Sequence, residues 1–369
     1  MRFPEFSGEW ERKRLKDVCN IRTGNKNTQD KSDNGIYPFY VRSQIVERIN
    51  SWTFDGEAIL TAGDGVGVGK VFHYSTGKIG VHQRVYILSD FKCDGKYLYS
   101  YFAGNFYNRV KRMSAKNSVD SVRMEMIADM PIALPSIEEQ KKIGHLLALL
   151  DDRIATQNKI IEKLQSLIKG LVDELMTVLL KGKLYPFSSF YIKAGEGGTP
   201  TTSVVEYYTE GTIPFIKIED LSCKYLTNNK DFITELGMQK SSAWLIPSKS
   251  VIYSNGATIG AISINEYPVC TKQGILGIVP NTNINVEYLY LLMSSSYFSK
   301  EISRIITEGT MKTAYLKDIN HIKCPLPSMA QQKNITNLTS SIEEKLSIEQ
   351  ELLRFLNLQK QYLLHMIFI

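Results

Sequence analysis

The stretch Leu134-Pro-Ser-Ile-Glu-Glu-Gln-Lys-Lys-Ile143 decides the fold, because its first three residues return 192 positions later as Leu-Pro-Ser at 326–328. In both places the serine is followed three residues on by a side chain that completes a capping box, Glu139 in one and Gln331 in the other. The proline before each serine keeps the preceding segment from continuing into the helix. Each stretch therefore predicts a helix start, and the pair indicates one module written twice.

Both predicted helices carry one apolar stripe with intervals alternating between four and three residues, as a coiled-coil face requires. In the first helix the stripe comprises Ile143, Leu147, Leu150, Ile154, Gln157, Ile161, Leu164, Ile168, Leu171, Leu175 and Val178. In the second it comprises Ile335, Thr339, Ile342, Leu346, Glu349, Leu353, Leu356, Lys360, Leu363 and Ile367. The simplest way to bury both stripes is against each other, so we expect an antiparallel pair.

Two features distinguish the stripes from uninterrupted apolar seams. Gln157 and Glu349 occupy equivalent slots, which predicts a polar layer that fixes the register of the pair. Thr339 and Lys360 stand where the first helix has leucine and isoleucine, which predicts a looser seam on the second helix.

The segments before the two helices also resemble each other. Short β-branched runs punctuated by Gly, Pro and Asn predict strands and hairpins in both. The matching stretches are 21–24 with 192–195, 35–39 with 211–215, 64–69 with 255–260, and Gln83 with Gln273. The sequence therefore predicts an α+β fold with an internal pseudo-twofold duplication. Its parts are a domain at 1–135, a helix at 136–182, a second domain at 183–327 and a second helix at 328–369.

Composition places the chain among ordinary globular proteins, with 369 residues, 43% hydrophobic and 22% charged. It has no apolar run near the roughly 20 residues of a membrane span. Its N-terminus lacks a signal-peptide core, so the cytoplasm is the expected location. Five scattered cysteines predict reduced structural thiols. Of the net charge of +6, residues 1–135 carry 20 Lys/Arg against 15 Asp/Glu, and residues 183–327 carry 13 against 12. We therefore expect the first domain to contribute more of any attraction to phosphates.

We predict no catalytic residue and no metal site in this chain. The glycine-rich stretch from Gly63 to Lys70 lacks the spacing of a phosphate-binding loop and lies between strand-like runs, so a tight turn or hairpin is expected there. The five histidines show no metal-ligand spacing, and no nucleophile elbow is present.

Two similar, non-catalytic domains on a helical spacer suit a target with two half-sites, of which double-stranded DNA is the obvious one. Arg and Lys suit the acceptors of guanine, and Asn and Gln suit adenine. The candidate DNA-binding residues are Arg42, Lys70, His82, Gln83 and Arg84 in the first domain, and Lys217, Asn255, Thr271, Lys272 and Gln273 in the second.

The chain resembles the specificity subunits of type I restriction-modification systems along its whole length. The resemblance lies in Arg2–Trp10, Leu15–Val18, the stretch 134–143 and the run Leu-Leu-Asp-Asp-Arg-Ile at 149–154. It implies two target-recognition domains, each reading half of a split DNA site, and a helical spacer that docks two modification (methyltransferase) subunits. Restriction/translocase subunits would join the complete enzyme. S-adenosylmethionine, ATP and Mg would then bind to partner subunits and not to this chain.

Two alternatives stay open at this point. The first is that the chain is the specificity chain of a different multi-subunit restriction-methylation system. The second is that it is a coiled-coil scaffold that binds only proteins. A DNA reader loses affinity steeply as salt rises, whereas a hydrophobic protein contact does not.

Overall fold

The computed structural model describes residues 2–65, 67–113, 121–256, 258–306 and 313–368. The chain divides into two compact units, one formed by Met1–Lys159 and Glu351–Ile369 and the other by Ile160–Gln350. Each unit holds one α+β domain and half of each of two long helices. These helices are α4 (Ile137–Leu179) and α9 (Met329–Phe368). No helix within the described residues is long and apolar enough to cross a membrane.

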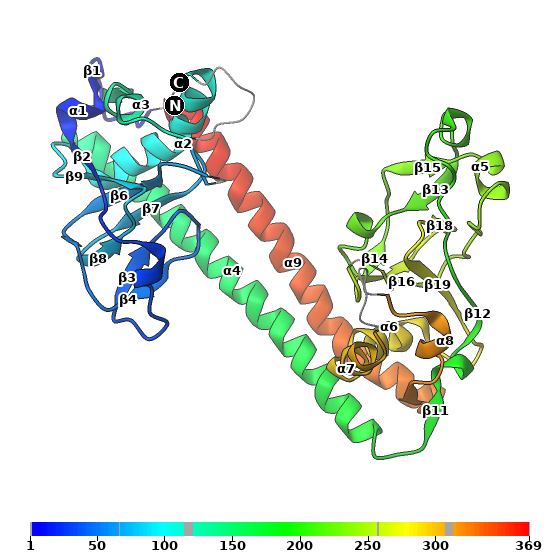
Figure 1. The fold of residues 1–369 in the computed structure, drawn as a ribbon. Helices are drawn as coiled ribbons and strands as arrows, with labels where there is room; N and C mark the ends of the chain where they lie inside the picture. The colour runs from blue at the N-terminus through cyan, green and yellow to red at the C-terminus, as the bar shows by residue number, and fades with distance from the viewer. Residues whose placement is uncertain (1, 66, 114–120, 257, 307–312, 369) are drawn as a thin grey trace. The chain divides into compact units, whose positions relative to one another are not determined.

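The first unit contains two four-stranded sheets and a two-stranded ribbon (Figure 1). One sheet has the order β2 (Asn20–Thr23), β9 (Val85–Ser89), β6 (Ala58–Ala62), β7 (Phe72–Ser75), and the other β4 (Glu47–Ile49), β3 (Tyr37–Tyr40), β8 (Lys78–Val81), β5 (Phe54–Asp55). The ribbon pairs β1 (Glu11–Arg14) with β10 (Pro131–Leu134). The short helices are α1 (Leu15–Val18), α2 (Gly95–Met113) and α3 (Met124–Ala128).

The second unit repeats this plan. Its larger sheet has the order β12 (Tyr191–Glu196), β19 (Ile275–Pro280), β16 (Val251–Ser254), β17 (Ile262–Asn265), β14 (Tyr225–Leu226), and its smaller sheet β15 (Asp231–Ile233), β13 (Ile213–Ile216), β18 (Cys270–Thr271). The ribbon pairs β11 (Leu184–Pro186) with β20 (Lys323–Pro325). Its helices are α5 (Glu235–Gln239), α6 (Val286–Ser294), α7 (Ser296–Ile305) and α8 (Leu316–Ile319).

Strand register shows which positions of the two domains correspond. Phe39 pairs with Gly80 in parallel in one domain, and Phe215 pairs with Cys270 in the other, which confirms the predicted match of 35–39 with 211–215. Continuing three residues from this pairing matches Gln83 with Gln273, also as predicted.

Two predicted matches are wrong. The match of 64–69 with 255–260 is off by one residue, because the Gly63 N–H donates to Arg84 and the equivalent Asn255 N–H donates to Gly274. The match of 21–24 with 192–195 is off by two. The glycine that follows β2, Gly24, donates its backbone N–H to Val85, and the residue with the equivalent bond in the second domain is Gly197, which donates to Ile275. The sequence similarity had matched Gly24 with Gly195. Backbone pairing determines the true match because a two-residue shift keeps the same face of the strand inward and leaves the local pattern almost unchanged.

In each unit, the parts of α4 and α9 that belong to it pack against the domain of that unit and against each other. In the first unit Ile143 and Leu147 of α4 share a core with Phe102 and Phe106 of α2 and with Ile367 of α9. In the second unit the end of α4 shares a core with Phe187, Phe298 and, from the beginning of α9, Ile335. The beginning of one helix therefore lies with the end of the other in each unit, so the pair is antiparallel as predicted (Figure 1).

The predicted stripe follows the buried or partly buried face of α4 from Ile143 to Leu175. Leu147, Leu150, Gln157 and Ile161 are buried, and Ile154 and Leu164 are partly buried. Val178, by contrast, is 61% exposed, so its assignment to the stripe is wrong. Val172 and Met176 are buried in its place, because this end of α4 packs against the second domain. A straight helix drifts by about 20° per heptad from the strict 3.5 repeat, which moves the buried face in this direction.

The stripe of α9 is buried to different degrees along its length. Ile335, Thr339, Leu356 and Ile367 are buried, whereas Ile342, Leu346, Glu349, Leu353, Lys360 and Leu363 are partly buried. Thr339 fits because its hydroxyl donates to the Thr336 carbonyl oxygen at 3.0 Å. Lys360 reaches out of the stripe to Asp151 of α4. Glu349 forms an ion pair with Lys345 at 3.2 Å. The polar layer of Gln157 and Glu349 stays a prediction.

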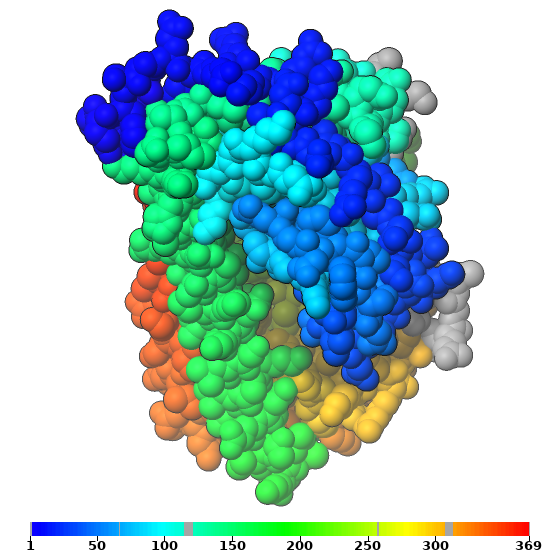
Figure 2. Space-filling model, turned by 90° about the vertical axis from the view of Figure 1, so that its left-hand side faces the viewer, coloured from blue at the N-terminus to red at the C-terminus, as the bar shows by residue number. Residues whose placement is uncertain are grey.

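The two helix caps differ from each other. At the start of α9 the box is reciprocal: Gln331 donates its backbone N–H to the Ser328 hydroxyl, and its side chain accepts from the Ser328 backbone at 3.0 Å. At the start of α4 the Ser136 hydroxyl accepts from the Glu139 N–H at 3.3 Å, but the Glu139 carboxylate is bound by Arg2 at 2.7 and 2.8 Å. The N-terminal segment, dark blue in Figure 2, lies over this part of α4. The serine half of the predicted first capping box is therefore confirmed, whereas its glutamate half is wrong because the Arg2 guanidinium binds the carboxylate.

Candidate nucleic-acid interface

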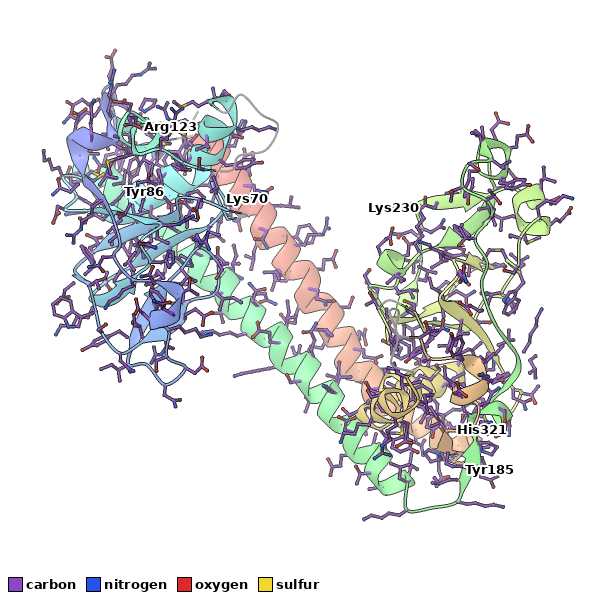
Figure 3. All side chains as sticks on the ribbon, in the orientation of Figure 1. Lys70, Tyr86, Arg123, Tyr185, Lys230 and His321 are labelled. Atoms are coloured by element: carbon purple, nitrogen blue, oxygen red, sulfur yellow. The ribbon has the colours of Figure 1, made fainter. Side chains whose placement is uncertain are left out.

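The glycine-rich stretch of the first domain is the turn between the antiparallel strands β6 and β7. The expected hairpin is therefore confirmed, with residues 63–71 connecting its two strands. Gly65 and Gly69 have φ angles of 78° and 66°, which glycine adopts without steric cost. Lys70, labelled in Figure 3, is exposed at the end of this turn, and its ammonium lies 5.6 Å from the Tyr107 ring centroid of α2.

Two of the predicted cations meet on one carboxylate of this turn. Arg42 donates from Nη1 to Asp64 Oδ1 at 2.8 Å, and Arg84 donates from Nη1 to Asp64 Oδ2. The side chains of Arg42 and Arg84 are 43% and 60% exposed, whereas that of Asp64 is 21% exposed. Burial acts to raise the pKa of Asp64, but the hydrogen bonds from both guanidiniums outweigh it and lower that pKa below its ordinary value.

His82 and Gln83 connect the cluster of Arg42, Asp64 and Arg84 to the segment that follows β2. His82 is 4% exposed, and its Nδ1 accepts the backbone N–H of Arg84 at 3.1 Å while Nε2 lies 3.3 Å from the Thr28 hydroxyl. Gln83 is exposed and donates to Asn27 Oδ1 at 2.7 Å. Burial and the two arginines lower the pKa of His82, with Asp64 opposing, so a neutral imidazole is favoured. His82 therefore supports its neighbours and is poorly placed to contact DNA itself.

The five candidates of the second domain divide into two groups. Lys272 and Gln273 are exposed after β18, and the Lys272 N–H donates to the Ile216 carbonyl oxygen beside Lys217. Lys217 is half-buried and forms an ion pair with Asp231 at 2.8 Å. These three candidates lie together at the end of β13.

Asn255 and Thr271 are both completely buried, so neither can reach a base in this conformation. Thr271 donates to the Ile275 carbonyl oxygen at 3.1 Å, and Asn255 donates to that of Ala314 at 3.1 Å. Register explains the burial, because Thr271 corresponds to the core residue Val81 of the first domain. We correct these two predictions: both residues are structural.

Sequence reasoning missed two acidic residues that lie beside the candidates. One is Asp64, which binds Arg42 and Arg84. The other is Glu196. Its carboxylate accepts the Gly274 N–H at 2.7 Å, beside Gln273. No local signal identifies either residue, since the strand pairing brings their partners from 20 to 78 positions away.

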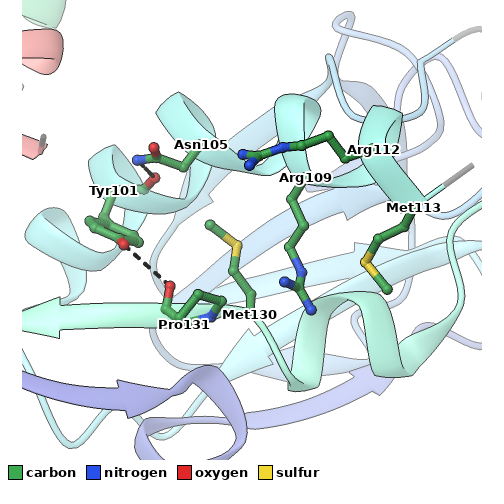
Figure 4. A pocket seen from close by; sticks show the side chains of 7 residues that line it. All are labelled: Tyr101, Asn105, Arg109, Arg112, Met113, Met130 and Pro131. Carbon is green, nitrogen blue, oxygen red and sulfur yellow. Dashed lines mark hydrogen bonds between the residues drawn. The ribbon is translucent and has the colours of Figure 1, made fainter.

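A pocket of about 290 Å³ lies beside the end of α2 (Figure 4). It is lined by Tyr101, Asn105, Arg109, Arg112, Met113, Met130 and Pro131. Arg109 donates from Nε to the Met126 carbonyl oxygen at 2.8 Å, and Tyr101 donates to Pro131 at 3.2 Å. At the corresponding helix end of the second domain, Arg304 is neutralised by an ion pair with Glu301.

The described residues contain no group of three His, Cys, Asp or Glu side chains that could hold a metal ion. All five cysteines are free, and Cys19, Cys270 and Cys324 are buried. Burial raises the pKa of the Cys270 thiol to about 11, which keeps it protonated.

Comparison with known proteins matches residues 7–166 and 190–357 to the family described as the type I restriction modification DNA specificity domain. The specificity subunit of the type I restriction enzyme EcoDI from Escherichia coli is 22% identical, over 89% of this chain and 80% of that protein. The MjaVIII specificity subunit from Methanocaldococcus jannaschii is 25% identical, over 95% and 89%. A crystal structure of the type I restriction-modification S subunit from M. genitalium has the same fold, with a TM-score of 0.64 at 16% identity over 100% and 99% of the two chains.

Proposed function

Because the chain belongs to the family of type I restriction modification DNA specificity domains, we propose that each of its two domains reads one half of a bipartite DNA site. The observation that carries this proposal is the duplicated position of Gln83 and Gln273. Both are exposed on equivalent loops beside basic residues, Arg84 in one domain and Lys272 in the other. The loops share a scaffold but differ in their polar side chains, which suits two different half-sites.

The proposed contact set differs from the one predicted from the sequence. It retains Arg42, Lys70, Gln83 and Arg84 in the first domain, and Lys217, Lys272 and Gln273 in the second, all of which are exposed or half-buried. Amide and guanidinium groups match the acceptor and donor patterns of base pairs in the major groove.

The chain carries the recognition function, and catalysis belongs to partner subunits in this proposal. Two methyltransferase subunits would dock along the helix pair, with S-adenosylmethionine bound to them. ATP and Mg would be bound by the restriction subunits. The helices support this assignment because residues 136–182 are neutral overall, with seven Lys/Arg against seven Asp/Glu. They therefore add little attraction to DNA themselves. A solved structure that concerns the assembly of a type I restriction-modification complex has this fold. The likeness covers 99% of the chain, with a TM-score of 0.56.

Exchange of the first domain tests the modular assignment. Replacing residues 1–145 by those of a relative with a known site transfers the domain together with the first turns of α4, so the junction stays intact. Methylation-aware sequencing of cells that carry the complete system should then show one changed half-site and one unchanged half-site. A change in both halves would contradict the assignment of one half-site to each domain.

Salt dependence separates a DNA reader from a protein-only scaffold. Affinity for a duplex carrying the site should fall linearly on a logarithmic plot against salt, with a slope of about −0.9 for each phosphate neutralised. A control duplex with both half-sites scrambled should bind more weakly at every salt concentration. Equal affinity for the two duplexes would contradict sequence-specific recognition.

A further inference from the structure

We propose that Asp64 is a positioning residue that holds Arg42 and Arg84 as a paired guanine reader, so that the half-site of the first domain contains at least one G·C pair whose recognition depends on Asp64. This inference rests on the proposed function. It adds the chemistry of one half-site and assigns a role to a residue that does not itself touch DNA.

The turn between β6 and β7 fixes the backbone of both arginines. The Gly63 N–H donates to the Arg84 carbonyl oxygen at 2.8 Å. A Cβ on Gly67 would lie 2.5 Å from the Arg42 carbonyl oxygen, so only glycine permits this approach. Both arginines are therefore held at their main chains by the turn that also carries Asp64.

The same turn is itself anchored to the rest of the domain. Asp64 forms an antiparallel bridge with Ser121, and the Val122 N–H donates to the Gly63 carbonyl oxygen at 2.7 Å. The Val122 carbonyl oxygen accepts the Tyr86 hydroxyl at 3.0 Å (Tyr86 is labelled in Figure 3). These hydrogen bonds therefore fix the backbone that carries the Asp64 carboxylate.

Each guanidinium uses one nitrogen on Asp64 and keeps other N–H donors for a ligand. A guanidinium has five N–H groups in a rigid fork. With Nη1 of Arg42 and of Arg84 bound to one carboxylate, the exposed remainder of each fork has a restricted orientation. This restriction lowers the conformational entropy that is lost on binding. Two parallel donors match the O6 and N7 acceptors of guanine in the major groove.

The second domain has no such pair, because glycines stand at both corresponding positions. Gly256 corresponds to Asp64, and Gly274 corresponds to Arg84. A Cβ on Gly256 would lie 3.2 Å from Gly274 Cα, so the two backbones pack directly against each other. The paired guanidiniums are therefore a feature of the first domain only, and we expect them to affect one half-site only.

Selection of bound duplexes from a randomised pool, with the full-length chain, tests this inference. The variants are Asp64→Asn, which removes the charge at nearly constant shape, and Arg84→Gln, which alters only an exposed side chain. The matched control is Asp129→Asn: Asp129 also binds two cations, Arg14 at 3.0 Å and Lys16 at 2.8 Å, elsewhere in the same domain.

The wild type and Asp129→Asn should select guanine at the same position or positions of one half-site. Asp64→Asn and Arg84→Gln should reduce that preference about tenfold, with the other half-site unchanged. If Asp64→Asn fails to fold, as judged by its melting temperature, Arg84→Gln decides the outcome alone.

Three outcomes would overturn the inference while leaving the proposed function intact. They are a site without guanine in either half, a guanine preference that survives in folded Asp64→Asn or in Arg84→Gln, and an equal loss of affinity for all sequences. The last would mean that the arginines bind phosphates. A wild type that selects no sequence would instead overturn the proposed function.

Discussion

Gln140 and Gln332, 192 positions apart, make the same two hydrogen bonds at the starts of α4 and α9. Each donates to the carbonyl oxygen of the proline five residues earlier, at 2.8 and 2.9 Å. Each also accepts a backbone N–H from its own domain, that of Asp94 at 3.0 Å and that of Asn285 at 2.7 Å. Both glutamines are buried. We call this arrangement the glutamine bracket; it fastens each helix to the domain that precedes it.

Loss of either glutamine bracket should destabilise the protein. Gln140→Leu and Gln332→Leu each leave a partly buried backbone donor and a proline carbonyl oxygen without the glutamine partner, and unsatisfied buried groups cost about 1–3 kcal/mol. Urea denaturation of each variant measures the change in the free energy of unfolding. Gln165→Leu, on the exposed face of α4, is the control and should change it by less than about 0.5 kcal/mol. Equal effects at all three positions would contradict the bracket.

The corrected match of Gly24 with Gly197 predicts that both positions reject a side chain. A Cβ there would lie 2.2 Å from the Val81 carbonyl oxygen and 2.1 Å from the Thr271 carbonyl oxygen, respectively. Substitution by alanine should cost about 1–3 kcal/mol at each, as overpacking does. Gly170 in α4 is the control, since nothing lies within 4 Å of its Cβ position. Gly170→Ala should stabilise the helix by up to about 1 kcal/mol. Tolerance of Gly197→Ala would show that the match is wrong.

His82 should make the stability of the first unit sensitive to mild acid. Its pKa in the folded state is lowered from 6.5 by burial and by Arg42 and Arg84. The unfolded chain therefore binds the proton more readily, and the stabilisation is present above pH 6.5 and is lost progressively as the pH falls from that value through the lower pKa of the folded state. The lowered pKa of Asp64 acts in a separate window, below its ordinary value of 3.8.

Denaturation at pH 7.5 and at pH 5.5 measures this effect. His82→Asn keeps an acceptor for the Arg84 N–H and removes the titrating group, so it should lose less stability than the wild type between the two pH values. His145→Asn, at an exposed position of α4, controls for the loss of a histidine. An equal loss in the wild type and His82→Asn would count against the prediction.

The ion pair between Lys360 and Asp151 should contribute little to stability. Their side chains are 30% and 32% exposed, and solvent screens a pair of this kind. A double-mutant cycle with Lys360→Ile and Asp151→Ala should give a coupling below about 1 kcal/mol. A coupling above about 2 kcal/mol would show that the lysine is an essential part of the helix seam.

The sequence predicted features that repeat at fixed spacing. The capped starts of the helices and the first four turns of the apolar stripe are local patterns, so they needed no knowledge of tertiary contacts. The error at Val178 arose where α4 packs on the second domain as well as on α9, since that contact depends on residues such as Phe298. Periodicity alone carries no information about which neighbour a helix face meets.

Individual contacts in the candidate interface were harder to predict than the architecture. The chemistry of Arg42 and Arg84 makes them candidate DNA-binding residues, and both are exposed. The chemistry of Asn255 and Thr271 does the same, but both are buried. Only strand register distinguishes the exposed candidates from the buried ones. It shows that Thr271 is equivalent to a core position of the first domain. Asp64 binds two partners from different loops, so the local sequence gives no signal of these contacts.

The glutamine bracket also bears on how genes for such chains can exchange segments. A crossover at the codon for Pro135 would separate Gln140 from the Asp94 backbone that it evolved to bind. A crossover further along α4 transfers the domain with its own bracket and joins two stretches of regular helix. The interior of the long helix is therefore the point at which a recombined gene can change half of the recognised site and still encode a correctly fastened domain.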